Sequence, residues 1–448
     1  MEGSDKLGSY ETGQLITAVT KITDLLRKCW GVAGAGIISA NLERKDDGDT
    51  VSFNPTVPGQ MVYAIFAFAG INDFSNLLRA LDREVMMLIN DVAKVVHNEV
   101  YRWGLGERGQ CNKNLGPSFF MVYRIGDFNT VRERKARAED VIFTPAAEPQ
   151  HSNSSGSAKN NIKSISLASL PGIAGFTDRA LLGMLKSFAG INREKSVKNW
   201  EKDFRLGAGV GANSVGMIFG MDAGWAVEGA VGSAYKIDAT YLSPHVNMAS
   251  RMMGACKQFK LTILLSQAVE ELMSTPSREK LRHVDTVYVK GSSEKSRIYT
   301  YDARHKGVDF FLFQRSDEQA DKDADNYTTA IWNTDQDLQE MRSHVTEAFE
   351  DKFKKALTQY LHGHWREAAS LFEEANNIMI ETVVDDGRIE HVTRFGKDLL
   401  NPEVQNDDAQ HIRRELGDGP CQSLLSYIKK RNYTAPDDWC GVRQLTSK

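Results

Sequence analysis

The segment from Val62 to Phe68 reads VYAIFAF, a continuous apolar run of strand length. From Leu77 to Val100, apolar side chains recur at three- and four-residue spacing, which predicts a helix. The segment from Trp103 to Asn112 carries three glycines and indicates a turn, and FFMVYRI, from Phe119 to Ile125, predicts a second strand. Strand, helix and strand in this order form the opening half of a ferredoxin-like βαββαβ layout, so we expect an α+β fold.

Three later segments extend this domain. Residues 144–161, TPAAEPQHSNSSGSAKNN, are rich in Pro, Ser, Asn and Gly and are expected to form a flexible surface insert. Helical periodicity resumes from Asp178 to Ile191. From His283 to Ala303, apolar and polar residues alternate on both sides of Gly291-Ser292, which predicts a β-hairpin.

Three short motifs identify a family. From Lys236 the chain reads KIDATYLSPHVNMASRMMGACKQF, and FAFAGINDFSNLL and NKNLGPSFFMVYRIGD begin at Phe66 and Asn112. Together they resemble the class III nucleotidyl cyclases, in particular a protist-type branch with a SYLSP-like turn before VNMASR. The resemblance is strong from about Val62 to Gln314. It implies a ferredoxin-like cyclase domain, in which the glycine-rich stretch from Leu206 to Gly232 forms a strand hairpin.

Asn247 and Arg251 match the residues that class III cyclases use in the transition state. They lie four residues apart and therefore on one face of a predicted helix. The resemblance implies that Asn247 orients the ribose and that Arg251 stabilises charge on the α-phosphate, which suits a guanidinium with several fixed donors. In a helix outside this motif, the same two residues would be ordinary solvated surface residues.

Lys113 and Thr240 match the two positions that read the base in this family. A lysine can donate to adenine N1 and a threonine can accept from the exocyclic amine, so the resemblance implies an ATP-like nucleotide bound at a dimer interface. Lys290, in YVKGSS, matches a family lysine that reaches the triphosphate. A lysine at a hairpin turn is just as often simply solvated.

Gly70 and Pro117 stand where the family carries its two metal-binding Asp residues, in segments that normally resemble F-C-D-I-R-x-F-T and K-N-I-G-D-A-F-L. Neither residue supplies a carboxylate for Mg²⁺. Asp73 lies three residues beyond the first position, and Asp127 lies ten beyond the second, roughly 33 Å along an extended strand. We therefore expect no cofactor to be bound by this chain alone, and Mg²⁺ or Mn²⁺ only through a partner.

The expected domain order is an N-terminal helix and linker over residues 1–60, a cyclase homology domain over 61–314, a charged linker over 315–348 and a helical tail over 349–448. Residues Leu15 to Cys29 carry one apolar stripe, typical of a helix that packs on its own domain or transmits a signal to a cyclase domain. In the tail, Phe349 to Leu361 and Trp365 to Asn376 are similar to one tetratricopeptide helix pair, which offers a surface for a protein partner.

Composition excludes several classes of function. The chain has 448 residues and a net charge of −4, so it lacks the net positive charge that is typical of proteins that bind nucleic acid. Its apolar stretches are too short or too glycine-rich for a transmembrane helix, and its N-terminus does not read as a secretory signal. Five cysteines without CxxC spacing favour a reducing compartment. We expect a cytoplasmic protein, or one that reaches the membrane through a partner.

Three functional hypotheses remain open at the level of sequence. The chain is a degenerate adenylyl cyclase subunit that completes a site with a metal-competent cyclase chain, or a non-catalytic pseudocyclase that acts as a structural or regulatory module. The third hypothesis, an active homodimer with other metal ligands, is the least favoured. The first two predict no activity of the isolated chain, and they differ in whether a metal-competent partner restores turnover.

Overall fold

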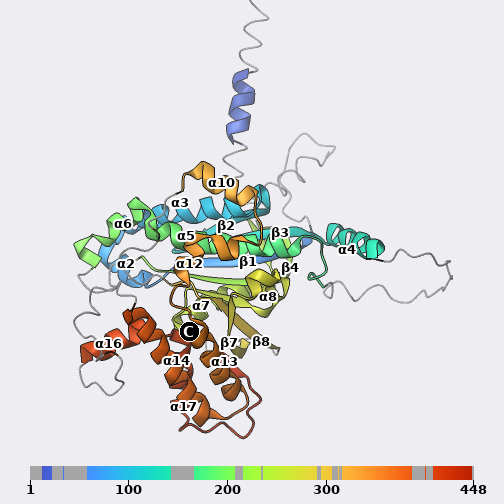
Figure 1. Ribbon diagram of the computed structural model, residues 1–448. Coiled ribbons are helices and arrows are strands. Elements are labelled where there is room, and N and C mark those ends of the chain that lie inside the picture. Colours follow the sequence, from blue (N-terminus) through green and yellow to red (C-terminus); the bar gives the residue numbers. More distant parts are fainter. Residues whose placement is uncertain are drawn as a thin grey trace, which may run out of the picture.

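The computed structural model shows a central sheet covered by helices on both faces, with a helical tail at one end (Figure 1). It describes residues 13–22, 34, 58–142, 166–206, 215–233, 236–289, 294–304, 311, 315–385, 399 and 407–445. Within these ranges the sheet has nine strands, in the order β2-β3-β1-β4-β6-β8-β7-β9, with β5 paired to β4 off this path. Residues 13–22 are helical, and most of the predicted segment Leu15 to Cys29 lies outside the described residues.

The two predicted strands of the ferredoxin-like half are confirmed, and two further strands pair with them. β1 (Gln60–Ile71) lies between β3 (Ser118–Asp127) and β4 (Met217–Ser233) and is antiparallel to both. β2 (Gly109–Leu115) pairs with the other edge of β3. The crossover helices α3 (Val85–Trp103) and α5 (Ile173–Arg193) cover one face of this sheet.

Strand β1 is apolar from Met61 onward because both of its faces are buried from Val62 to Ile71. One alternate set of its residues, which includes Ile65 and Ala67, packs in the core under α3 and α5. The other set, which includes Phe66 and Phe68, packs on the opposite face beneath α7 (Pro244–Phe259). A strand covered on both faces reads as an unbroken hydrophobic run, which is what Val62 to Phe68 shows.

The helix predicted from Leu77 to Val100 is divided into α2 (Phe74–Leu81), the 3₁₀ turn η1 (Asp82–Glu84) and α3. Asp82 follows α2 with φ of 47°, outside the right-handed helical region, so the helix is interrupted there. The remaining elements on this side of the sheet are η2 (Gly106–Arg108), α4 (Phe128–Ile142), α6 (Lys195–Glu201) and η3 (Phe204–Leu206). Residues 144–161, the predicted surface insert, lie outside the described residues.

The glycine-rich stretch differs from the expected strand hairpin. β4 runs unbroken from Met217 to Ser233, and its hairpin partner is the following strand, β5 (Lys236–Leu242). The glycines in β4 allow close approach of α7, since a Cβ on Gly220 would lie 2.1 Å from the backbone nitrogen of Met253. Glycine composition alone does not distinguish a turn from such a close contact between a strand and a helix.

The second half of the sheet follows α7. Its elements are β6 (Ile263–Ser266), α8 (Gln267–Leu272), α9 (Thr275–Arg278), β7 (Leu281–Val289) and β8 (Lys295–Tyr301). β7 and β8 pair antiparallel, as the alternation in the sequence predicts. The turn that joins them lies outside the described residues.

The segment predicted as a charged linker contains three helices: α10 (Asp317–Asp325), α11 (Ile331–Thr334) and α12 (Gln336–Met341). Its acidic residues pair with the cyclase-like part of the chain. The Lys186 ammonium lies 2.6 Å from Asp335 and 2.8 Å from Asp337, with all three side chains buried. Asp335 and Asp337 of this segment therefore help to dock these helices.

The tail consists of α13 (Glu347–Leu361), α14 (Trp365–Asp385), α16 (Asp407–Leu416), α17 (Gly419–Lys429) and the short strand β9 (Arg443–Leu445). α13 and α14 pack together through Phe353, Tyr360 and Phe372. β9 pairs parallel with β7 and extends the sheet. The two predicted tail helices are present, and their tetratricopeptide-like character stays a prediction.

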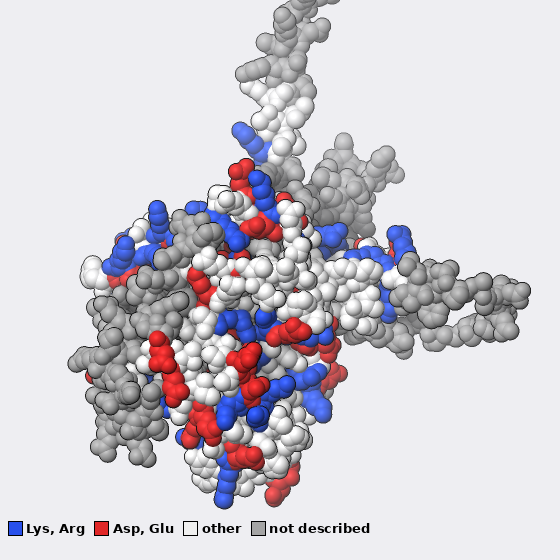
Figure 2. Space-filling model, viewed as in Figure 1, with Lys and Arg blue, Asp and Glu red and all other residues white. Residues whose placement is uncertain are grey.

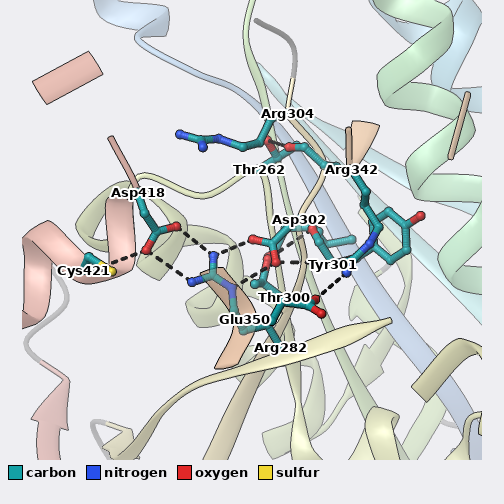
Figure 3. A network of polar contacts seen from close by, with 12 residues as sticks. Thr262, Arg282, Thr300, Tyr301, Asp302, Arg304, Arg342, Glu350, Asp418 and Cys421 are labelled. Carbon is teal, nitrogen blue, oxygen red and sulfur yellow. Dashed lines mark hydrogen bonds and ion pairs between the residues drawn. The ribbon is translucent and has the colours of Figure 1, made fainter. Parts of the chain in front are cut away.

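A buried ion-pair network fastens the tail to the sheet (Figure 3). Arg282 of β7 donates to Asp302, with its Nε 2.9 Å from Oδ2, and its Nη2 lies 2.9 Å from Asp418 Oδ1 at the start of α17. The guanidinium also lies 4.4 Å from the ring centroid of Phe353 in α13. Burial alone would raise the pKa of Asp418, but Arg282 outweighs burial and lowers it.

Candidate functional site

The two positions that the sequence motifs align with the family's metal-binding residues, Gly70 and Pro117, lie side by side at one end of the sheet. Gly70 is the second-last residue of β1 and pairs in register with Ser118 of β3. Pro117 is in the turn between β2 and β3, and its carbonyl accepts a hydrogen bond from the Ile71 amide at 3.0 Å. The fold thus brings together the two positions that the sequence motifs single out.

A methionine side chain fills the space beside Gly70. A Cβ added at Gly70 would lie 2.9 Å from Met253 Sδ and 3.3 Å from Ser118 Oγ. Met253 belongs to α7, two residues after Arg251. A thioether is a soft ligand that does not suit Mg²⁺, and no group of three His, Cys, Asp or Glu side chains among the described residues forms a metal site. These residues do not fit the two-metal centre of a class III cyclase.

Asp73 and Asp127 are the aspartates closest in sequence to Gly70 and Pro117. Asp127 is in register with Val62, at the far end of β1 from Gly70. Its carboxylate accepts hydrogen bonds from the Thr130 amide at 2.9 Å and the Thr130 hydroxyl at 2.8 Å, and the amide bond is the main cause of its lowered pKa. Asp73 adopts a left-handed backbone conformation at the start of α2. Asp127 therefore lies at the wrong end of β1 to act as a metal ligand beside Gly70.

Helix α7 carries the predicted transition-state residues. It begins at a Ser243 cap, whose hydroxyl accepts from the His245 amide at 3.0 Å, with Pro244 in its first turn. Asn247 is exposed and Arg251 is half-buried. The buried side of the helix is formed by Ala249, Met252, Ala255, Cys256 and Phe259. The helix therefore presents Asn247 away from the core, and Arg251 lies one turn further along.

The predicted base-reading residues lie on separate strands. Lys113 is a half-buried residue of β2, in register with Phe120, whose ring stacks on that of Phe68 with centroids 4.8 Å apart. Thr240 is a half-buried residue of β5, opposite Gly229 of β4. Strands β3, β1 and β4 lie between β2 and β5 in the sheet. Lys290 lies outside the described residues.

A polar triad at the start of α7 was not expected from the sequence. His245 Nδ1 lies 2.9 Å from Oδ2 of the buried Asp222 in β4, and Ser266 donates its hydroxyl to the other carboxylate oxygen. The imidazole sits over Gly224, where a Cβ would be 2.3 Å from the ring. This triad fixes the first turn of α7, two residues before Asn247. Its members are too far apart in sequence for spacing to reveal them, although a glycine within a buried strand signals a close contact.

The surface around these elements carries charges of both signs. Figure 2 shows basic and acidic side chains interspersed on the face in view. Within the described residues, no helix is both long and apolar enough to cross a membrane.

Comparison with known proteins shows homology to adenylate cyclases. The chain is 31% identical over 181 residues to the terminal-differentiation specific adenylate cyclase of Dictyostelium discoideum, a match that covers 39% of this chain and 8% of that protein. It is 35% identical over 129 residues to an adenylate cyclase of Anabaena cylindrica, which covers 28% of this chain and 24% of the relative. The chain thus matches less than a quarter of the length of either relative.

Solved structures and a family model give further, weaker similarities. A bacterial light-regulated adenylyl cyclase is 18% identical with a TM-score of 0.40, covering 65% of this chain and 64% of that one. The adenylyl cyclase CyaB from P. aeruginosa is 17% identical with a TM-score of 0.36, covering 54% of this chain and 95% of that one. Residues 1–43 match the family described as the RasGEFs all helical domain.

Proposed function

We propose that this chain is an adenylyl cyclase-like subunit of cyclic-nucleotide signalling that completes a catalytic site with a metal-competent cyclase partner. The observation that carries the proposal is an asymmetry. By resemblance to the family, Gly70 and Pro117 stand at metal positions without a carboxylate, and Met253 fills the space beside Gly70. In contrast, Asn247 stays exposed on the side of α7 that is not used for packing, and Arg251 is retained.

In such a composite site the chain supplies binding and charge stabilisation. The ribose 3′-oxygen attacks the α-phosphorus, the bond to the bridging oxygen breaks, and pyrophosphate leaves as the 3′,5′-cyclic nucleotide forms. Asn247 would hold the ribose, and Arg251 would donate to the α-phosphate oxygens as negative charge accumulates there. Mg²⁺ or Mn²⁺ would enter only through carboxylates of the partner, where it activates the nucleophile and neutralises charge.

The same proposal assigns adenine recognition to Lys113 and Thr240, with Lys290 at the triphosphate. The donor and acceptor chemistry of Lys113 and Thr240 suits the N1 and amino groups of adenine. We place the protein in the cytoplasm, or at a membrane through its partner, and we assign the tail a protein-binding role.

Met253 also favours a second candidate, a non-catalytic pseudocyclase. A site in which an apolar side chain fills the expected metal position suits a structural or regulatory module as well as a subunit of a composite catalytic site. The two candidates differ only in what a partner does for turnover.

The first experiment measures cyclic AMP formation by the purified chain with Mg²⁺ or Mn²⁺, alone and mixed with a metal-competent class III domain. The isolated chain is expected to match a boiled control. The mixture is expected to exceed the partner alone and to form a heterodimer in analytical ultracentrifugation. Turnover by the isolated chain that Arg251→Ala abolishes would refute the composite-site proposal, and a partner unaffected by this chain would favour the pseudocyclase.

A further inference from the structure

The last turn of α7 lies against the first turn of α17 in the tail. Phe259 is the last residue of α7, and Gly419 is the first residue of α17. A Cβ on Gly419 would lie 2.0 Å from the Phe259 carbonyl oxygen and 2.9 Å from that of Lys260. No side chain fits at such distances, so only a glycine allows the two helix ends to approach this closely. The positive N-terminal end of α17 thus lies beside the negative C-terminal end of α7, which favours the contact.

Side chains from the tail surround the same contact. The Lys260 ammonium donates to Gln422 Oε1 of α17 at 3.1 Å. The Arg443 guanidinium of β9 lies 5.0 Å from the ring centroid of Phe259, which is fully buried. The same guanidinium lies 5.1 Å from the ring centroid of Tyr427 in α17. One buried cation therefore contacts the end of α7 and helix α17 together.

Strand β9 connects this contact to the sheet. Arg443 Nε donates to the fully buried Asp285 of β7 at 2.8 Å. Removal of either partner would leave an uncompensated charge, so this pair holds Arg443 in place. Leu445 of β9 packs in the small core that also contains Met252 and Phe259 of α7. The tail thus supplies both an ion pair and an apolar side chain beneath the second half of α7.

Helix α7 is therefore held at its two ends by different parts of the chain. Its first turn is fixed on the sheet by the contact between Asp222 and His245, and its last turn is fixed on the tail. Arg251 lies eight residues before Phe259, about 12 Å along the helix axis. Backbone hydrogen bonds link successive turns of a helix, so a displacement of Phe259 is transmitted toward Arg251.

We propose that the tail is a positioning element for α7, in which Gly419 and Arg443 fix the place of Arg251 in the composite site. The inference rests on the catalytic role proposed for Arg251, and it gives the tail a task within this chain besides binding a protein partner. Gly419 and Arg443 act through α7 and are not placed at the nucleotide. A shift of about 1 Å at a catalytic group can reduce turnover by about 100-fold, so the effect is measurable.

The first test follows hydrogen exchange of α7 by mass spectrometry in the full chain that carries Gly419→Ala. The added methyl group must push α7 and α17 apart, so peptides from the second half of α7 should exchange at least about 10-fold faster than in the wild type. Gly363→Ala is the matched control. Gly363 lies in the tail with φ of 85°, and a Cβ there would approach only Trp439 and Ala435. This substitution strains the tail but should leave the exchange of α7 unchanged.

The second test measures steady-state turnover of the heterodimer with a metal-competent class III domain. Gly419→Ala should lower kcat by about 10- to 100-fold, while the KM for ATP and the dissociation constant of the heterodimer stay as in the wild type, because Arg251 acts in the transition state. Gln422→Ala removes the acceptor of Lys260 without a clash, so it serves as a variant that stays folded. It should change the exchange of α7 and the kcat in the same direction, by smaller factors.

Three results would overturn the inference. One is wild-type exchange of α7 in both Gly419→Ala and Gln422→Ala. Another is an equal effect of Gly419→Ala and Gly363→Ala on α7, which would mean that the tail acts only through overall stability. The third is faster exchange of α7 with an unchanged kcat, which would separate the contact from the place of Arg251. If no mixture with a cyclase partner turns over, the proposed function fails, whereas hydrogen exchange of the chain alone still tests the contact between α7 and α17.

Discussion

Replacing Gly70 by aspartate is expected to destabilise the chain, and Met253 is expected to be the reason. A Cβ at position 70 would lie 2.9 Å from Met253 Sδ, so the new side chain must displace the thioether. Overpacking of this kind costs about 1–3 kcal/mol, and a carboxylate beside buried strands without a cation adds to that cost. Met253→Ala alone should cost less than the about 2–5 kcal/mol of a fully buried methionine, because Met253 is only half-buried.

The informative quantity is the coupling between the two substitutions. If Met253 is the obstacle, the double variant should be at least about 1 kcal/mol more stable than the sum of the single effects predicts. Urea unfolding followed by tryptophan fluorescence gives each free energy of unfolding. Gly254→Asp is the matched control, because a Cβ there meets nothing within 4 Å. Although Gly254 follows Met253 in the chain, consecutive side chains on a helix do not face each other. The effect of Gly254→Asp should therefore add to that of Met253→Ala within about 0.5 kcal/mol.

Additive effects of Gly70→Asp and Met253→Ala on the free energy of unfolding would refute the contact.

The same reasoning applies to repair of the metal site. Restoring aspartate at positions 70 and 117 should yield a working second site in a heterodimer only when Met253 is also made smaller. Equal gains in catalytic activity with and without Met253→Ala would show that the Met253 side chain moves aside without cost.

Three further predictions test other parts of the structure. Arg282→Met should lower the free energy of unfolding by about 3–5 kcal/mol in urea, because it leaves Asp418 buried without its counter-ion; an unchanged midpoint would contradict this. Burial lowers the pKa of His283 to about 4, so between about pH 6.5 and pH 4 the unfolded chain binds more protons than the folded one. The free energy of unfolding should therefore decrease as the pH is lowered through that window, by up to about 3 kcal/mol. His283→Gln should flatten that part of the profile, and an unaltered slope would refute the assignment. A heterodimeric pocket read by Lys113 and Thr240 should prefer ATP over GTP in competition binding, and equal or tighter GTP binding would count against adenine recognition.

How much the sequence predicts depends on whether the information is local. The run from Val62 to Phe68 predicts a strand correctly because burial on both faces leaves a continuous apolar signature. The alternation from His283 to Ala303 predicts paired strands for a different reason, because buried residues largely alternate with partly exposed ones along β7. Motif spacing also locates Gly70 and Pro117, which the fold brings together across two strands.

Contacts between distant segments were not predictable in this way. Met253 beside Gly70 depends on how α7 crosses the sheet, and nothing in the local pattern around either residue shows it. The acidic stretch after Arg315 reads as a solvated linker because its partner Arg102, which binds Asp317 and Asp321, lies 215 and 219 residues away.

The central claim is that this chain supplies the transition-state residues to a site whose metal ligands come from a partner. The most direct measurement uses a metal-competent class III cyclase domain whose own transition-state arginine has been replaced, so that its homodimer is silent. Adding this chain is expected to restore cyclic AMP formation. Arg251→Ala in this chain is expected to reduce the restored rate by about 10²- to 10³-fold. Lys257→Ala, which changes an exposed residue of the same helix, is expected to leave the rate unchanged. No restored activity, or activity that Arg251→Ala leaves intact, would contradict the account.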